Sequence, residues 1–149
     1  MQLRAIVIDD DEACRTLLAL RLRQRGYEVI CLPGPTACPL YKDAECSCPQ
    51  DEVCGDFLLT DNRMPDMSGL ELIERQTKGG CKGMVGQKAV LSGTWSQEDL
   101  RKAQGLGCMV FDKPYHAEAI ETWLDAREKF IPSDRRLVDF SFGDEGEGS

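Results

Sequence analysis

The chain has 149 residues, a formal net charge of −8 and a pI near 4.7. Hydrophobic residues make up 42% of it and charged residues 30%, which is typical of one folded globular domain rather than a disordered segment. The acidic balance argues against direct binding of nucleic acid, and no stretch is long and apolar enough to span a membrane.

Short apolar runs alternate with helical patterns along most of the chain. The first run, residues 3–8, begins near the N-terminus without the features of a signal peptide, so we expect a cytoplasmic protein. A helix is predicted over residues 11–25, because Gly26 is a favoured residue just past a helix end. Further strands are predicted over residues 27–32, 56–61, 87–92 and 108–112, and further helices over residues 69–77, 97–105 (with Ser96 as N-cap) and 116–130. This alternation predicts an α/β fold, a doubly wound parallel sheet with helices on both faces.

The end of the chain divides into a helix and a tail. Residues 1–130 are expected to form the domain, and residues 131–149 end in an acidic, glycine-rich run that predicts a mobile C-terminal tail. In the last helix, the apolar residues expected to face the sheet are Ala119, Ile120, Trp123, Leu124 and Ala126.

Residues 33–55 interrupt the alternation with prolines and cysteines. We predict an irregular insertion, in which residues 38–43 could form a short helix. Four thiolates suit a tetrahedral Zn²⁺ site or an Fe–S cluster, although this spacing lacks the C-x2-C pairs of common zinc sites. Redox-active thiols and plain free cysteines therefore stay open as alternatives. The cysteines concerned are Cys38, Cys46, Cys48 and Cys54.

Polar side chains follow four of the predicted strands. Asp9 and Asp10 end the first, Asp61 the third, Ser92 the fourth, and Lys113 follows the fifth. If these strands are neighbours, their carboxyl ends meet at one rim of the sheet, where ligands of open α/β sheets bind. Clustered carboxylates suit Mg²⁺, and a nearby ammonium could neutralise a phosphoryl group. Taken singly, each residue has a plainer explanation as a helix cap, turn residue or surface cation.

Four pieces of sequence, in this order, resemble the receiver domain of two-component response regulators. They are residues 6–12 (IVIDDDE), 59–61 with 64–70 (LTD and MPDMSGL), 91–93 (LSG) and 113–114 (KP). The resemblance covers about residues 3–130 apart from the cysteine-rich segment. It implies a flavodoxin-like five-stranded sheet of order 2-1-3-4-5, with the insertion between strands 2 and 3.

The resemblance also implies roles for individual residues. Asp61 would accept a phosphoryl group from the phosphohistidine of a sensor histidine kinase or a phosphotransfer protein. Ser92 would supply a hydroxyl that moves toward the phosphoryl group, and Lys113 would pair with that group. The implied ligands of Mg²⁺ (or Mn²⁺) are Asp10, Asp61 and the backbone carbonyl of Arg63, with Asp9 acting through water.

The expected function is therefore that of a stand-alone response regulator in a two-component system or phosphorelay, a phosphorylation switch rather than an enzyme. Phosphorylation would change the face formed by residues 87–92, 97–105 and 108–112, and with it the binding of a downstream protein. One departure concerns the aromatic residue that the family usually has three residues before the lysine. This chain has Val110 there and Phe111 next to it, which puts aromatic-coupled switching in question.

Two other functions remain open from the sequence. Asp9-Asp10-Asp11 contains the D-x-D pattern of Mg²⁺-dependent phosphohydrolases, in which Asp9 would be the nucleophile. The cysteine-rich segment could instead make the protein a metal- or redox-sensing binding module.

Overall fold

The computed structural model describes most of the chain. The described residues are 2–34, 55–65, 67–78, 87–113 and 116–137, together with the backbone of residues 41–42 and 45–46. Within this part, none of the helices has the length and the apolar character needed to cross a membrane.

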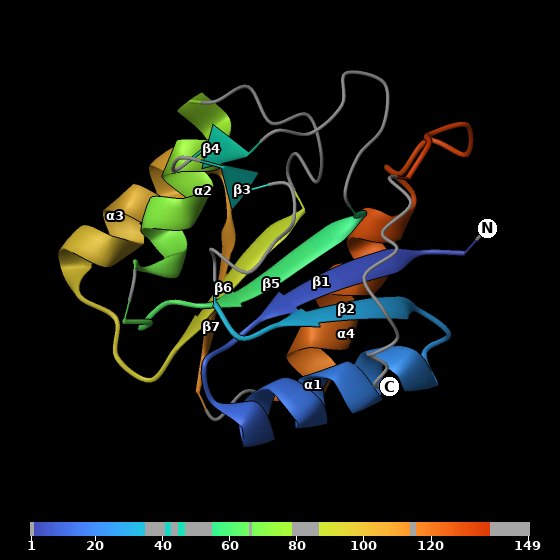
Figure 1. Cartoon of the computed structure of the whole chain (residues 1–149), viewed down its shortest axis with the longest axis horizontal. Coiled ribbons are helices and arrows are strands. Elements are labelled where there is room, and N and C mark those ends of the chain that lie inside the picture. Colours follow the sequence, from blue (N-terminus) through green and yellow to red (C-terminus); the bar gives the residue numbers. More distant parts are fainter. Residues whose placement is uncertain are drawn as a thin grey trace.

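A five-stranded sheet forms the centre of the molecule, in the order β2-β1-β5-β6-β7 (Figure 1). All four neighbouring pairs are parallel. Every residue of the three inner strands is buried, as expected for continuous apolar runs covered on both faces. The predicted α/β fold and strand order are therefore confirmed. The strands are β1 (Arg4–Ile8), β2 (Glu28–Leu32), β5 (Phe57–Asp61), β6 (Lys88–Ser92) and β7 (Met109–Asp112).

Two helices cover each face of the sheet. Helices α1 (Glu12–Gln24) and α4 (Ala117–Glu128) pack on one face, and α2 (Gly69–Lys78) and α3 (Gln97–Leu106) on the other (Figure 1). The sheet thus separates two hydrophobic clusters, which we call the α1/α4 cluster and the α2/α3 cluster. Side chains of one strand alternate between them.

Capping residues define the start of α1 and both ends of α3. Asp11 accepts from the backbone N–H of Ala13 at 2.9 Å and so caps α1. Ser96 accepts from the N–H of Asp99 at 3.0 Å, which confirms it as the N-cap of α3. Helix α3 ends at Gly107, whose φ of 75° lies in the left-handed region that glycine adopts without strain.

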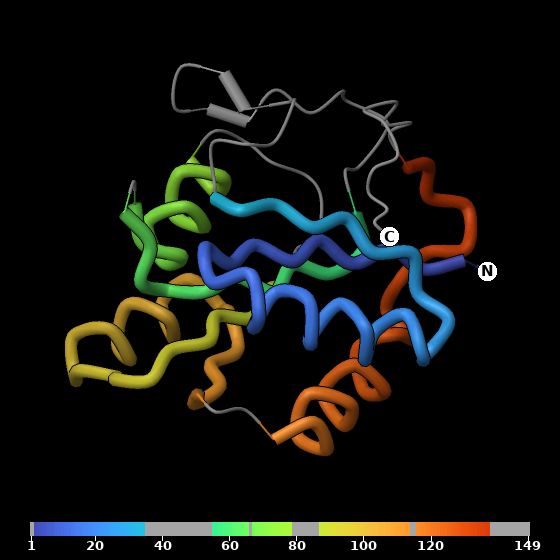
Figure 2. The backbone as a smooth tube through the Cα atoms, turned by 60° about the horizontal axis from the view of Figure 1, so that its bottom comes forward, coloured from blue at the N-terminus to red at the C-terminus, as the bar shows by residue number. Residues whose placement is uncertain are grey.

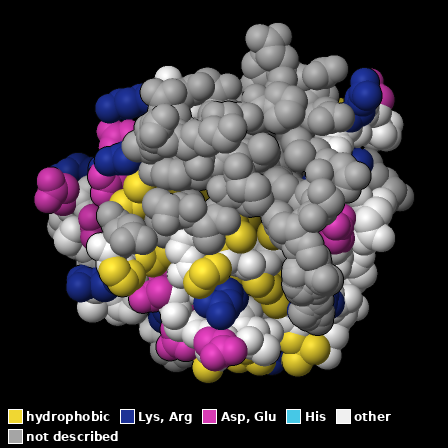
Figure 3. Space-filling model, in the orientation of Figure 1, with side chains coloured by type: hydrophobic (Ala, Val, Ile, Leu, Met, Phe, Trp, Pro, Cys, Tyr) yellow, Lys and Arg dark blue, Asp and Glu magenta, His cyan; other side chains and the backbone are white. Residues whose placement is uncertain are grey.

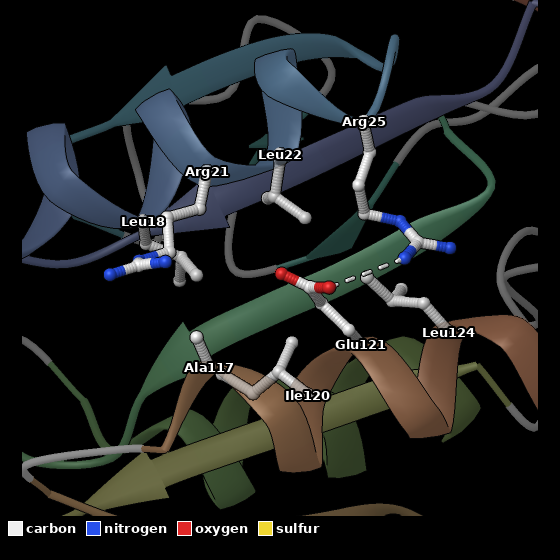
Figure 4. Close-up of a pocket in the computed structure, with 8 residues that line it drawn as sticks. All are labelled: Leu18, Arg21, Leu22, Arg25, Ala117, Ile120, Glu121 and Leu124. Carbon is white, nitrogen blue, oxygen red and sulfur yellow. Dashed lines mark ion pairs between the residues drawn. The ribbon is translucent and has the colours of Figure 1, made fainter.

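Helix α4 faces the sheet with fewer residues than predicted. Leu18 and Leu22 of α1 and Ile120 and Leu124 of α4 point toward one another, at a shallow apolar pocket between the two helices (Figure 4). Ala119 and Ala126 are exposed, so their predicted inward orientation was wrong. Ala119 lies one residue before the buried Ile120 and Ala126 two residues after the buried Leu124, so the two alanines are turned about 100° and 200° around the helix from these buried positions.

The cysteine-rich insertion contains two short antiparallel strands, β3 (Tyr41–Lys42) and β4 (Glu45–Cys46). The short helix allowed over residues 38–43 is therefore wrong at residues 41–42, because these pair with a second extended segment instead of forming local helical bonds. The predicted metal ligands Cys38, Cys48 and Cys54 lie outside the described residues, and only the backbone of Cys46 is described. The zinc or Fe–S site stays a prediction.

The segment after α4 turns back to the rim opposite the acidic strand ends. Ile131 is buried in the α1/α4 cluster. Arg135 donates to both carboxylate oxygens of Asp56, at 2.7 and 2.6 Å, and to the carbonyl of Gln2 at 2.7 Å. Figure 2 shows this segment beside the N-terminal end of β1. The tail expected from residue 131 thus begins with a part that contacts the domain, while residues 138–149 lie outside the described part.

The surface of the described part is mixed in character. In Figure 3, acidic and basic side chains lie interspersed on the face shown, with hydrophobic side chains between them. Leu17 and Leu20 on α1 are about half exposed, at 48% and 51%. Exposed leucines are ordinary on the surface of a globular protein.

Candidate functional site

Three carboxylates gather where β1 and β5 end. Oxygen atoms of Asp9, Asp10 and Asp61 all lie within 4.8 Å of one another. Asp9 and Asp61 are buried, with 6% and 7% of their surface exposed, whereas Asp10 is open to solvent. The two strands are parallel neighbours, so their carboxyl ends coincide at one rim, as the sequence predicted.

Lys113 joins this cluster from the end of β7. Its ammonium lies 3.0 Å from Asp9 Oδ2 and 3.0 Å from Asp61 Oδ1. Burial alone would lower the pKa of Lys113, but the hydrogen bonds that its ammonium donates to both carboxylates outweigh this effect and raise that pKa. The pKa of Asp61 is also raised, by burial first and then by the neighbouring charge of Asp9, against the opposing effect of Lys113. The positive charge of Lys113 therefore does not fully offset the effects of burial and of Asp9 on the pKa of Asp61.

The turn after β5 requires glycine at position 69. The N–H of Gly69 donates to the carbonyl of Asn62 at 3.0 Å, and Asn62 Oδ1 accepts from the N–H of Leu70 at 3.2 Å. A Cβ atom on Gly69 would lie 2.6 Å from the carbonyl oxygen of Asp61, closer than real contacts allow. The start of α2 is thus held directly against Asp61. Helix α2 begins at Gly69, as the sequence predicted, whereas Asn62 was not among the predicted site residues, because the residue that it bonds lies eight positions away.

Ser92 is the last residue of β6, the strand that lies between β5, which carries Asp61, and β7, which precedes Lys113. Leu91 is the register partner of Asp61, and the carbonyl of Ser92 accepts from the N–H of Lys113 at 2.9 Å. The residue is 1% exposed. Its hydroxyl donates to the carbonyl of Thr94 at 2.8 Å and accepts from the N–H of Thr94 at 3.3 Å. Ser92 therefore lies on the strand between Asp61 and Lys113.

Asp9 is oriented by two further groups. Its Oδ1 accepts from the N–H of Asp11 at 2.9 Å, and its carbonyl accepts from Nη1 of Arg15 at 2.7 Å. Arg15 was not among the predicted site residues. Its position in the first turns of α1, six residues beyond Asp9, was the available signal.

An open hollow lies beside the acids, between the turn after β5 and the first turn of α3. Asp10 and Arg63 line it, and its other lining residues are Asn62, Met64, Pro65, Ser68 and Asp99. Arg63 itself is exposed. Three carboxylates with a backbone loop beside them form an oxygen-rich donor set, which fits a hard divalent cation such as Mg²⁺.

The two residues that depart from the family pattern face opposite sides of the sheet. Phe111 is buried at 7% exposure in the α1/α4 cluster, and its ring meets that of Trp123 edge-on with centroids 6.0 Å apart. Val110 packs on the α2/α3 cluster, as does Trp95. Phe111 consequently does not occupy the side on which Val110 lies.

Solved structures share this architecture. A CheY-like receiver domain protein from Methanospirillum hungatei is 25% identical, with a TM-score of 0.66 over 88% of this chain and all of that one. The structure of FixJ-N is 23% identical, with a TM-score of 0.68 over 89% of this chain and 98% of that one. The CheY4 chemotaxis protein of Vibrio cholerae is 20% identical, with a TM-score of 0.65 over 85% of this chain and 98% of that one.

The sequence comparison agrees with the fold. No family model matches the chain. The transcriptional regulatory protein FixJ of Azorhizobium caulinodans is 35% identical over 115 residues, which are 76% of this chain. The chain has a response-regulator receiver domain. It spans 49% of the length of that FixJ relative, so the activity of the whole relative does not transfer with the receiver domain.

Proposed function

We propose that this receiver domain is a phosphorylation switch in which Asp61 accepts a phosphoryl group from a phosphohistidine. The observation that supports this best is the ammonium of Lys113, which lies 3.0 Å from a carboxylate oxygen of both Asp61 and Asp9. A buried carboxylate with a cation at one oxygen and two acids beside it matches the needs of phosphoryl transfer, which depends mainly on positioning and charge stabilisation.

In the proposed reaction, a lone pair on a carboxylate oxygen of Asp61 forms a bond to phosphorus. The P–N bond of the phosphohistidine breaks, and its electron pair stays on the imidazole nitrogen, which then takes up a proton. Lys113 remains charged at neutral pH, because its raised pKa favours the ammonium, and it pairs with the added phosphoryl oxygens. Asp9 and Asp10 would hold Mg²⁺ together with Asp61 and the carbonyl of Arg63, and this cation supplies further neutralisation of the phosphoryl charge.

The partners in this proposal are proteins. A sensor histidine kinase or a phosphotransfer protein supplies the phosphoryl group. Ser92 then donates its hydroxyl to a phosphoryl oxygen, and the face made by β6, α3 and β7 changes its affinity for a downstream protein. The chain acts as a phosphoacceptor that assists its own phosphorylation and dephosphorylation.

The test is phosphorylation by acetyl phosphate in Mg²⁺, followed by phosphate-affinity electrophoresis. Wild type should acquire an alkali-labile phosphoryl group, and Asp61→Asn should not. Asp112→Asn is the matched control, because Asp112 is an exposed carboxylate at the end of β7. Equal labelling of wild type and Asp61→Asn would refute the assignment of Asp61.

The same preparation tests the phosphohydrolase alternative. An enzyme with Asp9 as nucleophile would turn over phosphate esters and lose that turnover in Asp9→Asn. In the switch, wild type should show no sustained turnover of such esters above the Asp61→Asn protein.

A further inference from the structure

The loop between β6 and α3 is tied to β7 by a tryptophan. Trp95 is half-buried against the α2/α3 cluster, and its indole Nε1–H donates to the carbonyl of Phe111 at 3.2 Å. Phe111 precedes Lys113 by two residues. One side chain therefore connects the loop that follows Ser92 with the strand that carries Lys113.

The same loop is fastened to Ser92. The hydroxyl of Ser92 donates its one proton to the carbonyl of Thr94 at 2.8 Å. If a phosphoryl oxygen on Asp61 accepts that proton, the carbonyl of Thr94 loses this donor. Thr94 directly precedes Trp95, so the backbone that positions the indole is released at the same time.

The two central side chains of β7, those of Val110 and Phe111, are not placed to make this connection. Phe111 points to the opposite cluster, where its ring contacts Trp123. Val110 lies on the Trp95 side, but its aliphatic side chain has no hydrogen-bonding group. Trp95 combines an apolar ring on this side with a polar bond to the backbone of β7.

We propose that Trp95 is the positioning residue that couples Ser92 to β7 and Lys113. Phosphorylation of Asp61 breaks the hydrogen bond between the indole of Trp95 and the carbonyl of Phe111. This inference rests on the proposed function of Asp61. In the unphosphorylated protein, Trp95 holds the loop against β7. When Ser92 turns to the phosphoryl group, the indole leaves the α2/α3 cluster and becomes more exposed.

Fluorescence can follow this change, because the chain contains only two tryptophans. In Trp123→Phe, Trp95 is the sole indole, and acetyl phosphate with Mg²⁺ should shift its emission to longer wavelength. In Trp95→Phe, the remaining Trp123 should keep its emission under the same conditions. Adding Asp61→Asn to the Trp123→Phe protein should abolish the shift.

A kinetic readout separates positioning from simple packing. Trp95→Phe keeps an aromatic ring but loses the N–H donor, so the phosphoryl group on Asp61 should form or decay at a rate several-fold different from wild type. Trp123→Phe, an equally large change in the opposite cluster, should leave these rates unchanged. Equal rates in wild type and Trp95→Phe would overturn the positioning role.

Measuring the phosphoryl group in the same samples keeps the two proposals apart. A labelled Trp123→Phe protein with unchanged emission would overturn the inference on Trp95 and leave the role of Asp61 intact. Absence of label in wild type would overturn the role of Asp61 and this inference with it. If Trp123→Phe does not fold, 5-fluorotryptophan in the wild type gives two ¹⁹F signals, assigned with Trp95→Phe, of which only that of Trp95 should move on phosphorylation.

Discussion

Asp61 is a buried carboxylate whose ionisation opposes folding. Its pKa is raised by burial and by Asp9, with Lys113 compensating only in part. The folded chain therefore binds more protons than the unfolded chain between the ordinary pKa of Asp and the raised one, and stability falls as the pH rises through that window. A neutral side chain of the same shape does not carry this cost.

Replacement of Asp61 by asparagine should accordingly stabilise the protein at neutral pH in the presence of a chelator. The gain over wild type should shrink as the pH falls below the ordinary pKa of Asp, where both side chains are neutral. Urea unfolding at a series of pH values measures this. Asp112→Asn, at an exposed carboxylate, should show no such gain; an Asp61→Asn protein less stable than wild type at neutral pH would contradict the expectation.

Gly69 gives a second prediction for a single residue. Gly69→Ala places a Cβ atom 2.6 Å from the carbonyl of Asp61, and backbone cannot give way as a flexible side chain would. The free energy of unfolding should fall by about 1–3 kcal/mol, as for other overpacked sites. Gly93→Ala is the control at the end of β6, where nothing lies within 4 Å of the added atom and little change is expected. Urea titration measures the free energy of unfolding of both variants. An equal loss in the two would contradict the close approach of position 69 to the carbonyl of Asp61.

Among the elements, the segment after α4 was harder to predict than the strands and helices. The strands follow from apolar runs between turn residues, and α1 and α3 from capping residues that act within a few positions. The pairing of Arg135 with Asp56 joins residues 79 positions apart, and no local pattern announces it. Ala119 and Ala126 show a related limit, since alanine is apolar on either side of a helix and only its neighbours reveal the buried face.

Loss of the Arg135 side chain should weaken this attachment strongly. The side chain of Asp56 is 2% exposed, so Arg135→Ala leaves a buried carboxylate without its cation. We expect the free energy of unfolding of Arg135→Ala to be lower than that of wild type by about 2–3 kcal/mol. The stability of Arg135→Lys should lie between those of Arg135→Ala and wild type, because lysine keeps the positive charge but cannot bond both carboxylate oxygens in the same bidentate geometry. Arg101→Ala, an exposed arginine on α3, should change it by less than about 0.5 kcal/mol. Thermal and urea unfolding test this, and similar losses in both alanine variants would show that the pair with Asp56 contributes little.

At the scale of the whole molecule, the site depends on the order of the strands. Lys113 lies 104 residues from Asp9 and 52 from Asp61 along the chain. Their meeting was predictable, because parallel strands place all their carboxyl ends at one rim and the polar residues follow those ends. That Val110 and Phe111 face opposite sides follows from the alternation of side chains along a strand. The hydrogen bond from Trp95 to the carbonyl of Phe111 was not predictable, since it depends on side-chain orientation across the sheet.

The convergence of acids also predicts how a divalent cation affects the fold. A ligand that binds only the folded chain stabilises it by about 2.7 kcal/mol at about a hundred times its Kd. The unfolded chain separates Asp9 and Asp10 from Asp61 by some fifty residues of sequence, so it offers no comparable site. Mg²⁺ should therefore raise the melting temperature of wild type above its value in NaCl of equal ionic strength.

Two carboxylates on the same hollow make this prediction specific. Asp10→Asn removes an acid that lies with Asp9 and Asp61, and it should abolish most of the Mg²⁺-dependent rise. Asp99→Asn changes an acid that also lines the hollow but lies outside the three-acid cluster, so its rise should match that of wild type. A rise that is equal in all three proteins would mean that Mg²⁺ acts on the general acidic surface, because screening of scattered charges does not distinguish one carboxylate from another.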